Sequence, residues 1–415
     1  MGNPYPPPPA WAHEIVTIAV TGTDGKTSTT RFCAAGLAAA RLGPVARMTT
    51  VDAGIDDEIG PPPQDHDGFL AMMRSLYERG GRRAAIEVTS AVLGLGFARA
   101  WPVRVGVFTN LGNDHMRTHG SPEHYLASKA QLFLALPAGG AAVLNAGDPN
   151  AALIAEVLPR EVRALWFAGP GAAEDRAVDL RVRSAVASWD GLALELETHE
   201  QLGPMPTRLR LRTAAPFQAS NAAAALLACV ALGVSGVDAA AGIEACPAPP
   251  GRFERVTVAG VIGPRVIVDY AHTPEALRAA LASARALCEG RVILVLGAGG
   301  DGDRSKRPAL GQAASAADEV ILTSDNPRGE DPAAITEDIA AGLAPALPRI
   351  VELDRDRAIA TAIDRARVDD LVLIAGKGHE RVQAIAGELR PFCDQDSARA
   401  ALERRRRAGD PAQST

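Results

Sequence analysis

One segment near the start of the chain limits the possible folds more than any other. An apolar, β-branched run at residues 15–20 leads into a glycine-rich loop, Thr-Gly-Thr-Asp-Gly-Lys-Thr-Ser, at residues 21–28, and then into a helical stretch. Glycines let backbone N–H groups approach phosphate oxygens, and a helix that starts behind them adds its dipole. Lys26 can reach terminal phosphates, and Thr27 can offer its hydroxyl to Mg²⁺. The segment therefore predicts a nucleoside triphosphate site at the end of a buried strand.

The loop is a shortened variant, because Val20 stands where the strict phosphate-loop pattern has its first glycine. An ordinary glycine-rich turn between a strand and a helix is the alternative interpretation. The succession of strand, Gly-Lys-Thr and helix favours the nucleotide site. The loop residues expected to contact the nucleotide are Thr23, Asp24, Gly25, Lys26, Thr27 and Ser28.

The composition narrows the function further. With 47% hydrophobic residues, 22% charged residues and a formal net charge of −6, the 415-residue chain is typical of a globular protein of two or three domains. This balance argues against non-specific binding to nucleic acid or membranes. The sequence shows no signal-peptide pattern, no membrane-spanning apolar run and no paired spacing of its five cysteines. We therefore expect a cytoplasmic protein with reduced thiols.

The order of apolar runs predicts an α/β architecture, because short β-branched runs alternate with alanine-rich stretches. A proline and glycine cluster at residues 246–251 interrupts the pattern and is expected to act as a hinge. We expect an irregular proline-rich segment at residues 1–14, a nucleotide-binding domain at residues 15–247 and a second doubly wound domain at residues 248–415.

The pattern also places individual elements within these domains. The expected helices include residues 31–42, 124–135 and 219–232. The expected strands lie at residues 15–20, 84–88, 103–109, 141–145, 179–198 (an antiparallel pair), 208–212, 265–269, 292–296, 319–323 and 371–375.

Two polar side chains follow strands beside the loop. Glu87 lies near the end of the strand expected at residues 84–88, and His115 follows the strand expected at residues 103–109. The carboxyl ends of parallel strands share one crevice, so both side chains are expected to face the bound magnesium and nucleotide. Taken alone, a buried paired glutamate and a structural histidine would explain them. For Lys129, spacing alone indicates a solvent-facing helix lysine.

Taken in order along nearly the whole chain, these segments resemble the Mur ligases, in particular their MurE type, which adds the third amino acid to UDP-N-acetylmuramoyl-dipeptide. Residues 21–27 resemble the family's ATP loop, residues 87–90 its magnesium-ligand segment and residues 108–115 its second magnesium segment. Lys129 falls where the family carries a carbamylated lysine that helps to hold a second magnesium ion. The resemblance implies a metal site formed by Thr27, Glu87, His115 and Lys129, and catalytic roles for Lys26, Lys129 and His115.

Later motifs extend the resemblance. Asn221, in Pro-Phe-Gln-Ala-Ser-Asn, matches a segment of the family's adenine pocket. Residues 250–254 and 268–274 resemble two nucleotide-contact segments, which implies roles for Arg252, Asp269 and His272. Residues 325–328 (Asp-Asn-Pro-Arg) resemble the motif for meso-diaminopimelate, and residues 375–380 (Ala-Gly-Lys-Gly-His-Glu) resemble a second amino-acid segment. The implied contacts to the amino acid come from Arg304, Asp325, Asn326, Arg328, Gly376 and Glu380.

The resemblance implies a central P-loop-type Mur ligase ATPase domain followed by a Rossmann-like C-terminal Mur ligase domain. The implied activity transfers the γ-phosphate of ATP to a substrate carboxylate, after which an amine displaces the phosphate and forms an amide. This chemistry needs charge neutralisation and positioning rather than a covalent enzyme nucleophile. The implied cofactors are ATP and Mg²⁺, and the implied partners are a small-molecule carboxylate and an amino acid.

The chain also departs from the family pattern. Only residues 1–14 precede the loop strand, where the usual member has a domain that holds the uridine nucleotide. Ala91 stands in place of a histidine, and Asp24 in place of an asparagine. Gly302 replaces the arginine that binds the amino acid, and Arg304, two residues on, is the expected substitute.

The segment at residues 51–67, where contacts to the acceptor are expected, is acidic. If it lines the acceptor site, it suits an anionic UDP-sugar poorly. The alternative interpretation is a solvated loop. The leading hypothesis is a MurE-like ligase for a carboxylate other than, or besides, UDP-muramoyl-dipeptide, with Arg328 and Glu380 pairing the amino acid's carboxylate and ammonium. The second is true cell-wall synthesis, with another chain supplying the missing domain. The third is a non-catalytic ATP-binding homologue, which the intact loop lysine and metal-ligand set disfavour.

Overall fold

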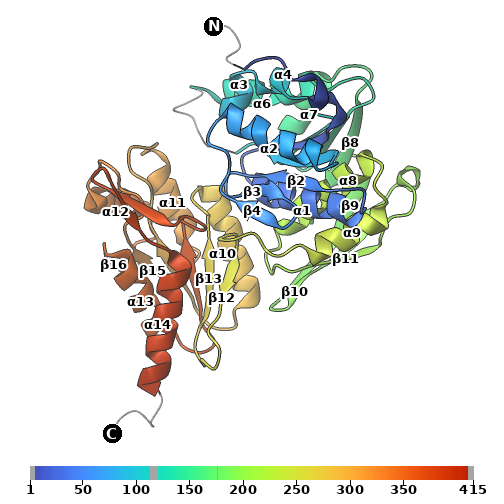
Figure 1. The fold of residues 1–415 in the computed structure, drawn as a ribbon. Helices are drawn as coiled ribbons and strands as arrows, with labels where there is room; N and C mark the ends of the chain where they lie inside the picture. Colours follow the sequence, from blue (N-terminus) through green and yellow to red (C-terminus); the bar gives the residue numbers. More distant parts are fainter. Residues whose placement is uncertain (1–4, 113–119, 175, 410–415) are drawn as a thin grey trace. The chain divides into compact units, whose positions relative to one another are not determined.

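The computed structural model describes residues 5–112, 120–174 and 176–409. The chain forms two compact units, Met1–Pro247 and Ala248–Thr415, each with its own sheet and core (Figure 1). Within the described ranges, no helix combines the length and hydropathy that crossing a bilayer requires.

The first unit is built on one mixed sheet. Its strands are β1 (Val16–Thr21), β2 (Val45–Met48), β3 (Ala53–Ile55), β4 (Glu58–Gly60), β5 (Arg83–Glu87), β6 (Val105–Phe108), β7 (Ala141–Asn145), β8 (Arg163–Ala168), β9 (Leu180–Ser188), β10 (Gly191–Thr198) and β11 (Arg208–Leu211). They lie in the order β11-β10-β9-β8-β7-β6-β1-β5-β2-β3-β4. The strands from β8 to β2 run parallel, whereas β9–β11 and β3–β4 form antiparallel edges.

Helices cover both faces of this sheet. They are η1 (Ala10–Glu14), α1 (Lys26–Ala39), α2 (His66–Glu78), α3 (Ser90–Gly94), α4 (Phe97–Ala100), α6 (Pro122–Leu134), α7 (Asn150–Glu156), η2 (Glu200–Leu202), α8 (Gln218–Ala231) and α9 (Gly236–Ala245). Side chains alternate along β1: Ile18 and Val20 join a core with α1, α8 and α9, whereas Ala19 joins a core with α2, α3, α4 and α6. A strand buried on both faces is mostly apolar, and the two polar residues of β1, Thr17 and Thr21, are themselves fully buried.

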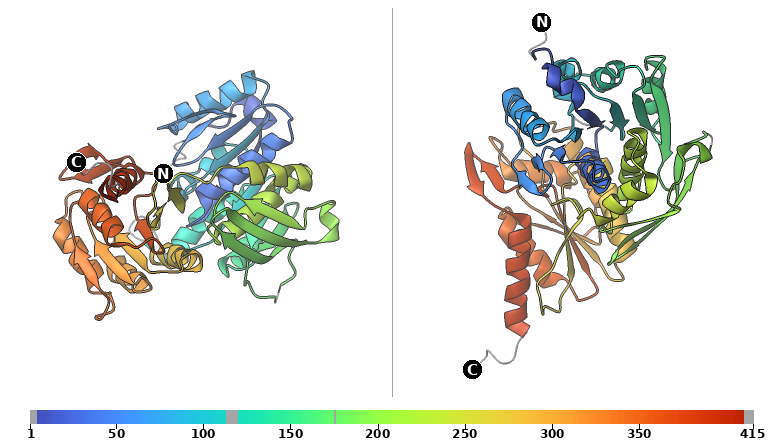
Figure 2. Two further views of the ribbon diagram at one scale, coloured as in Figure 1. Left: turned by 90° about the horizontal axis from the view of Figure 1, so that it is seen from below. Right: turned by 45° about the vertical axis from the view of Figure 1, so that its right-hand side comes forward.

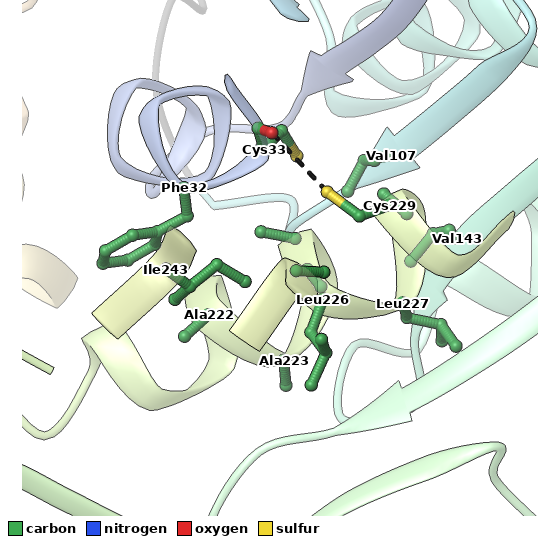
Figure 3. Packing of buried hydrophobic residues seen from close by; sticks show 14 of the residues in the cluster. Phe32, Cys33, Val107, Val143, Ala222, Ala223, Leu226, Leu227, Cys229 and Ile243 are labelled. Atoms are coloured by element: carbon green, nitrogen blue, oxygen red, sulfur yellow. Dashed lines mark hydrogen bonds between the residues drawn. The ribbon is translucent and has the colours of Figure 1, made fainter. Parts of the chain in front are cut away.

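The three helices on the α1 face pack at close range. Phe32 of α1, Leu226 of α8 and Ile243 of α9 meet in this core (Figure 3). A Cβ at Gly36 would stand 2.8 Å from Cys229 Sγ, and one at Gly242 would stand 2.2 Å from the Ala35 carbonyl oxygen. The helices therefore touch through backbone and small residues rather than through long side chains.

The second unit is a smaller, mostly parallel α/β unit. Its strands are β12 (Glu254–Val256), β13 (Arg265–Asp269), β14 (Val292–Leu296), β15 (Glu319–Leu322), β16 (Arg349–Val351) and β17 (Leu371–Ala375), with a separate hairpin of β18 (Val382–Ile385) and β19 (Glu388–Pro391). The sheet order is β12-β13-β17-β14-β15-β16, and only β12 pairs antiparallel. Its helices are α10 (Pro274–Leu287), α11 (Lys306–Ala314), α12 (Pro332–Ala340), α13 (Arg355–Arg365) and α14 (Asp394–Gly409).

The helices and loops of the second unit leave one end of its sheet for polar side chains. The long helix α14 packs beside α13 (Figures 1 and 2), and both share a buried cluster with β13, β14 and β17. Helix α10 begins with Thr273 as N-cap and Pro274 in the first turn, a strong local start signal. The carboxyl ends of β13, β15 and β17 open at one edge of the sheet, where loops carry polar side chains.

The α/β class expected from the sequence is confirmed, and the buried strands match best. The strands expected at residues 141–145, 265–269, 292–296 and 371–375 have the observed bounds. The helix expected at residues 31–42 instead begins at Lys26, because the last loop residues already form its first turn. The acidic segment at residues 51–67 is more than a loop: it contains β3 and β4, and Asp56, Asp57 and Glu58 are exposed where these two strands turn.

Candidate functional site

Two glycines shape the phosphate loop between β1 and α1. Gly22 and Gly25 have φ angles of +152° and +83°. A Cβ at Gly22 would stand 1.8 Å from Thr109 Oγ1, and one at Gly25 would stand 2.3 Å from Asn221 Oδ1. Gly25 is also the N-cap of α1, and no side chain of the described residues caps the helix there. The first N–H groups of α1 are thus available to an anion.

Residues that follow β6 hold the loop backbone in place. Thr109 Oγ1 and Asn110 Nδ2 donate hydrogen bonds to the Asp24 carbonyl oxygen at 2.7 and 3.2 Å. Asn110 Oδ1 accepts from the Asp24 N–H at 2.9 Å. The aspartate in place of the family's asparagine therefore has a fixed backbone. Sequence reasoning missed these two roles, although the position just after a buried strand was the signal.

The other loop residues have partners within the same unit. Lys26 Nζ folds back and donates to the Thr23 carbonyl oxygen at 2.7 Å. Gln218 Nε2 donates to Ser28 Oγ at 3.1 Å, and Asn221 Nδ2 donates to Gln218 Oε1 at 2.8 Å. The first turn of α8 therefore brings the predicted Asn221 to the loop, through a glutamine that the sequence analysis did not select.

Thr27 and Glu87 form a buried pair beside the loop. Thr27 Oγ1 donates to Glu87 Oε2 at 2.9 Å, and the Thr50 N–H donates to the same oxygen at 3.2 Å. Glu87 is 7% exposed and ends β5, the strand next to β1. A hydroxyl and a carboxylate oxygen are ligands that Mg²⁺ prefers, so this pair fits a magnesium ion bound with ATP phosphates.

The wider metal set is less complete in the described part of the chain. His115 lies at residues 113–119, outside the described ranges. Among the described residues, no group of three or more His, Cys, Asp and Glu side chains gathers around a point that could hold an ion. An ion here would therefore take its remaining ligands from phosphate, water or the groups named below.

Lys129 is buried at the loop rather than solvent-facing. Its Nζ donates to the Gly22 carbonyl oxygen at 2.7 Å and lies 4.2 Å from the centroid of the Tyr125 ring. The side chain is 1% exposed. Tyr125 in turn places its hydroxyl 3.2 Å from Thr23 Oγ1. The solvent-facing position indicated by spacing alone is wrong, because this face of α6 packs on the loop.

In the second unit, Asp269 fastens two backbone segments. Its carboxylate accepts from the N–H groups of Phe253 and Ala271 at 2.6 and 2.7 Å. Arg252 lies over the Tyr270 ring, with its Cζ 4.5 Å from the ring centroid, and its buried Nε finds no hydrogen-bond partner among the described residues. These contacts order the segment expected to touch the nucleotide.

His272 and Tyr270 complete this group. His272 Nδ1 lies 2.9 Å from the Tyr270 carbonyl oxygen, and the two rings are 4.6 Å apart in an edge-on arrangement. Tyr270 also lies 4.9 Å from the His379 ring. An arginine and two imidazoles around one phenol ring form a surface suited to a planar ligand.

The predicted amino-acid residues gather beyond β15 and β17. Asn326 Nδ2 donates to Glu380 Oε2 at 2.7 Å. Gly376 has a φ of +112°, and a Cβ there would stand 2.5 Å from Asp325 Oδ2. Burial raises the pKa of Asp325, although the charges of Arg355 and Lys377 oppose this shift. The structure thus brings together Asp325, Asn326, Gly376 and Glu380.

The two predicted arginines differ in position. Arg328 is exposed, has a φ of +53° and donates from Nη1 to the Gly300 carbonyl oxygen at 2.8 Å. Arg304 is 62% exposed and pairs with Asp338 at 3.3 Å and with Glu330 at 3.7 Å. Within the described residues, Arg304 makes no hydrogen bond or ion pair with the Asn326 and Glu380 cluster. Its guanidinium is already matched by carboxylates.

Within the expected acceptor segment, the carboxylate of Asp52 forms ion pairs with two arginines. Asp52 pairs with Arg31, and with Arg47 at 3.0 Å, and accepts from Thr49 Oγ1 at 2.9 Å. Burial raises the pKa of Asp52, but the two guanidinium charges and the hydrogen bonds lower it more, so the net shift is downward. Ala91, which replaces the family's histidine, is exposed in α3.

Comparison with known proteins covers both units. The model of the Mur ligase middle domain matches residues 20–229, and that of the Mur ligase glutamate ligase domain matches residues 251–378. The UDP-N-acetylmuramoyl-L-alanyl-D-glutamate–2,6-diaminopimelate ligase of Alkalilimnicola ehrlichii is 40% identical over 394 residues, covering 93% of this chain and 76% of that protein. The enzyme of the same name from Streptomyces avermitilis is 38% identical over 404 residues, covering 94% and 76%.

Solved structures agree with these matches. The structure of a UDP-N-acetylmuramoyl-L-alanyl-D-glutamate–2,6-diaminopimelate ligase superposes with a TM-score of 0.65 at 30% identity, covering 94% of this chain and 79% of that one. The folylpolyglutamate synthase of Mycobacterium tuberculosis, complexed with ADP and AMPPCP, has a TM-score of 0.67 at 20% identity and covers 97% and 93%. The second match speaks for the fold alone.

Proposed function

The chain belongs to the Mur ligase family, and from this premise we propose how its residues carry out the ligation. It is a MurE-like, ATP-dependent ligase that activates a carboxylate as an acyl phosphate and couples it to the amine of an amino acid. The observation that carries the assignment of residues is the strand–loop–helix of β1 and α1 with the Thr27 and Glu87 pair beside it.

The loop is proposed to bind the ATP phosphates. The N–H groups that follow Gly25 face the loop without a side-chain cap, so they can donate to phosphate oxygens. Lys26 would leave the Thr23 carbonyl oxygen and place its ammonium on the transferred phosphate, where negative charge collects. Asn221, at the start of α8, is proposed to contact the adenine.

Thr27 and Glu87 are proposed to hold Mg²⁺, with His115 as a further candidate ligand. When bound, the ion would neutralise charge on the phosphate oxygens. Lys129 stands within reach of the loop, and we propose that it is carbamylated, which would turn a buried cation into a carboxylate ligand. The Gly22 carbonyl oxygen accepts from its unmodified ammonium in the structure described here.

For the nucleophile, we propose an amino acid of the meso-diaminopimelate type. Such a molecule carries two ammonium groups and two carboxylates. Glu380 offers a carboxylate oxygen to an ammonium, and Arg328 offers an exposed guanidinium to a carboxylate. Arg304 would contribute only if its pairs with Asp338 and Glu330 open. Arg252, Asp269 and His272 are likewise proposed to contact the nucleotide.

The second candidate function is the reaction named for the relatives, joining diaminopimelate to UDP-N-acetylmuramoyl-L-alanyl-D-glutamate. The 40% identity to one such enzyme favours it. Against it stand the exposed acidic turn at Asp56, which suits an anionic UDP-sugar poorly, and Ala91 in place of the family's histidine. The acceptor carboxylate is therefore the part of the function that experiment has to decide.

The test measures release of ADP together with mass-spectrometric detection of product. The purified protein receives either UDP-N-acetylmuramoyl-dipeptide or one of a panel of other peptide carboxylates, each with diaminopimelate, lysine or glutamate in turn. A product that carries diaminopimelate supports the second candidate. ATP turnover that needs diaminopimelate and a different carboxylate supports the first. ATP binding without turnover for any pair of substrates would contradict both and support a non-catalytic homologue.

The loop lysine separates ligation from simple binding. We expect Lys26→Ala to lower turnover by at least about 100-fold, because it removes a charge that stabilises the transferred phosphate. Arg74→Ala, which removes a half-exposed cation on α2 of the same unit, is the matched control and should keep full turnover. Equal activity of the two variants would show that Lys26 plays no part in catalysis.

A further inference from the structure

A fully buried lysine lies inside the proposed amino-acid site. Lys377 follows β17 between Gly376 and Gly378, and its side chain is 0% exposed. Its Nζ donates to Glu380 Oε2 at 2.8 Å and to Asn326 Oδ1 at 3.0 Å, and lies 3.7 Å from Asp325 Oδ1. A buried ammonium needs charge partners and hydrogen-bond acceptors, and this one finds all of them on two segments already assigned to the amino acid.

The lysine fixes which way the Asn326 amide faces. Asn326 Oδ1 accepts two hydrogen bonds, one from Lys377 Nζ and one from the Ala384 N–H at 2.9 Å. Two donors on one atom identify it as the oxygen, so the amide nitrogen must face Glu380. Without the ammonium, this orientation would rest on the Ala384 N–H and on the hydrogen bond from Asn326 Nδ2 to Glu380 Oε2.

The same contacts leave one oxygen of Glu380 available. Both donors, Lys377 Nζ and Asn326 Nδ2, bind Oε2. No donor from the described part of the chain reaches Oε1, and the side chain is 29% exposed. The carboxylate is therefore anchored by one oxygen, which leaves the other able to accept from an ammonium.

The charges of the cluster also depend on this lysine. Asp325 and Glu380 supply two carboxylates, and Lys377 contacts both. Burial raises the pKa of Asp325, and the charges of Arg355 and Lys377 act against that rise. Removing Lys377 would leave two carboxylates facing each other in a poorly solvated place, which favours protonation of one of them.

We infer that Lys377 is a positioning residue of the amino-acid site: its ammonium holds Glu380 by one oxygen and orients Asn326, so that Glu380 Oε1 is set to accept an ammonium of the incoming amino acid. This inference rests on the proposed function, in which Glu380 and Asn326 bind the amino acid. Lys377 itself touches no substrate; it acts through its two neighbours.

A role in stability alone is the competing explanation, since a buried cation that loses its contacts destabilises a fold whether or not a ligand binds. The two roles differ in what they change. A structural role lowers thermal stability and affects both substrates alike. A positioning role raises the KM for the amino acid and leaves the KM for ATP and most of kcat in place.

The test compares Lys377→Met with Arg291→Met. Arg291 pairs with buried Asp370 and Glu319. It directly precedes β14 and so lies at the amino ends of the parallel strands, whereas Lys377 lies at their carboxyl ends. Both variants should lose thermal stability. Only Lys377→Met should raise the KM for the amino acid, by about 10- to 100-fold, the loss expected for one charge-assisted hydrogen bond. As the pH is lowered, the KM of Lys377→Met for the amino acid should begin to rise at a higher pH than that of the wild type, because Asp325 is protonated more readily without the lysine.

A combined variant shows whether Lys377 acts through its neighbours. If it acts through Glu380 and Asn326, then adding Lys377→Met to Glu380→Gln/Asn326→Ala should lower kcat/KM for the amino acid no further. Multiplying losses, or an amino-acid KM that Lys377→Met leaves unchanged, would overturn the inference while the proposed function stands. A wild-type protein whose ATP turnover never depends on an amino acid would overturn both.

Discussion

The conformation of Gly25 gives a prediction whose size can be worked out from the structure. Gly25 and Gly80 have nearly the same φ, +83° and +82°. An added Cβ at Gly80 meets nothing within 4 Å, whereas one at Gly25 would stand 2.3 Å from Asn221 Oδ1. Alanine at the two positions therefore shares the same backbone strain and differs only in what the methyl group displaces. Gly80→Ala is the matched control for Gly25→Ala.

The shared strain is small. A left-handed conformation costs a non-glycine residue about 1–2 kcal/mol, and the stiffer unfolded chain offsets about 0.4–1 kcal/mol of this. At Gly25, the methyl group also forces Asn221 away from Gln218 Oε1, which it contacts at 2.8 Å. A lost hydrogen bond and overpacking together add about 2–4 kcal/mol. We expect Gly80→Ala to lower Tm by a few degrees and Gly25→Ala to lower it several degrees further.

Thermal unfolding and the KM for ATP are the two measurements. Gly25→Ala should raise the KM for ATP as well, because the loop N–H groups move with the displaced backbone, whereas Gly80→Ala should leave it unchanged. Adding Asn221→Ala to Gly25→Ala should recover part of the stability, since the clash is then relieved. Equal Tm and equal KM for the two glycine variants would refute the reasoning.

Two further predictions concern charges in the first unit. Lys129→Ala should be nearly inactive and should regain part of its ATP turnover with short carboxylates, if a carbamate at this position serves as a ligand; full activity of the variant would rule that role out. The pKa of Asp52 lies below its ordinary value, so its pairs with Arg31 and Arg47 stabilise the fold above the unfolded pKa of about 3.9 and lose this effect as the pH falls through the lower, folded pKa. Chemical unfolding of wild type and Asp52→Asn should therefore differ at neutral pH and converge in acid; a constant difference would contradict the assignment.

Sequence patterns were strongest where burial is complete. Strands such as β14 and β17 are apolar at every position, and a run of this kind has few other ways to satisfy its backbone. The phosphate loop was equally predictable from the sequence, because glycine spacing and a following helix depend on local geometry alone. Short, polar or edge strands such as β3, β4 and β16 carry no such pattern, so their pairing was not predicted.

Contacts across long stretches of chain were beyond the sequence. The aromatic neighbour of Lys129 lies one helical turn away, but the carbonyl oxygen that Lys129 binds belongs to Gly22, 107 residues earlier. The sequence suggested that Arg304 could bind the amino acid, but in the structure it pairs with Asp338 of α12. Lys377 stands inside a motif quoted from the sequence, yet only the fold shows that its ammonium joins Asn326 to Glu380. Spacing reports local neighbours, whereas these partners depend on topology.

The close packing around α1 bears on how nucleotide affinity arises. At Gly36 and Gly242, backbone and small side chains of α1, α8 and α9 leave no room for even a methyl group. A helix held in this way has little freedom to tilt or slide, and the loop at its start shares that rigidity. The entropy of ordering the loop is therefore lost when the unit folds and not when the nucleotide binds. As a result, little of the free energy gained from contacts to the phosphates is offset by ordering the loop.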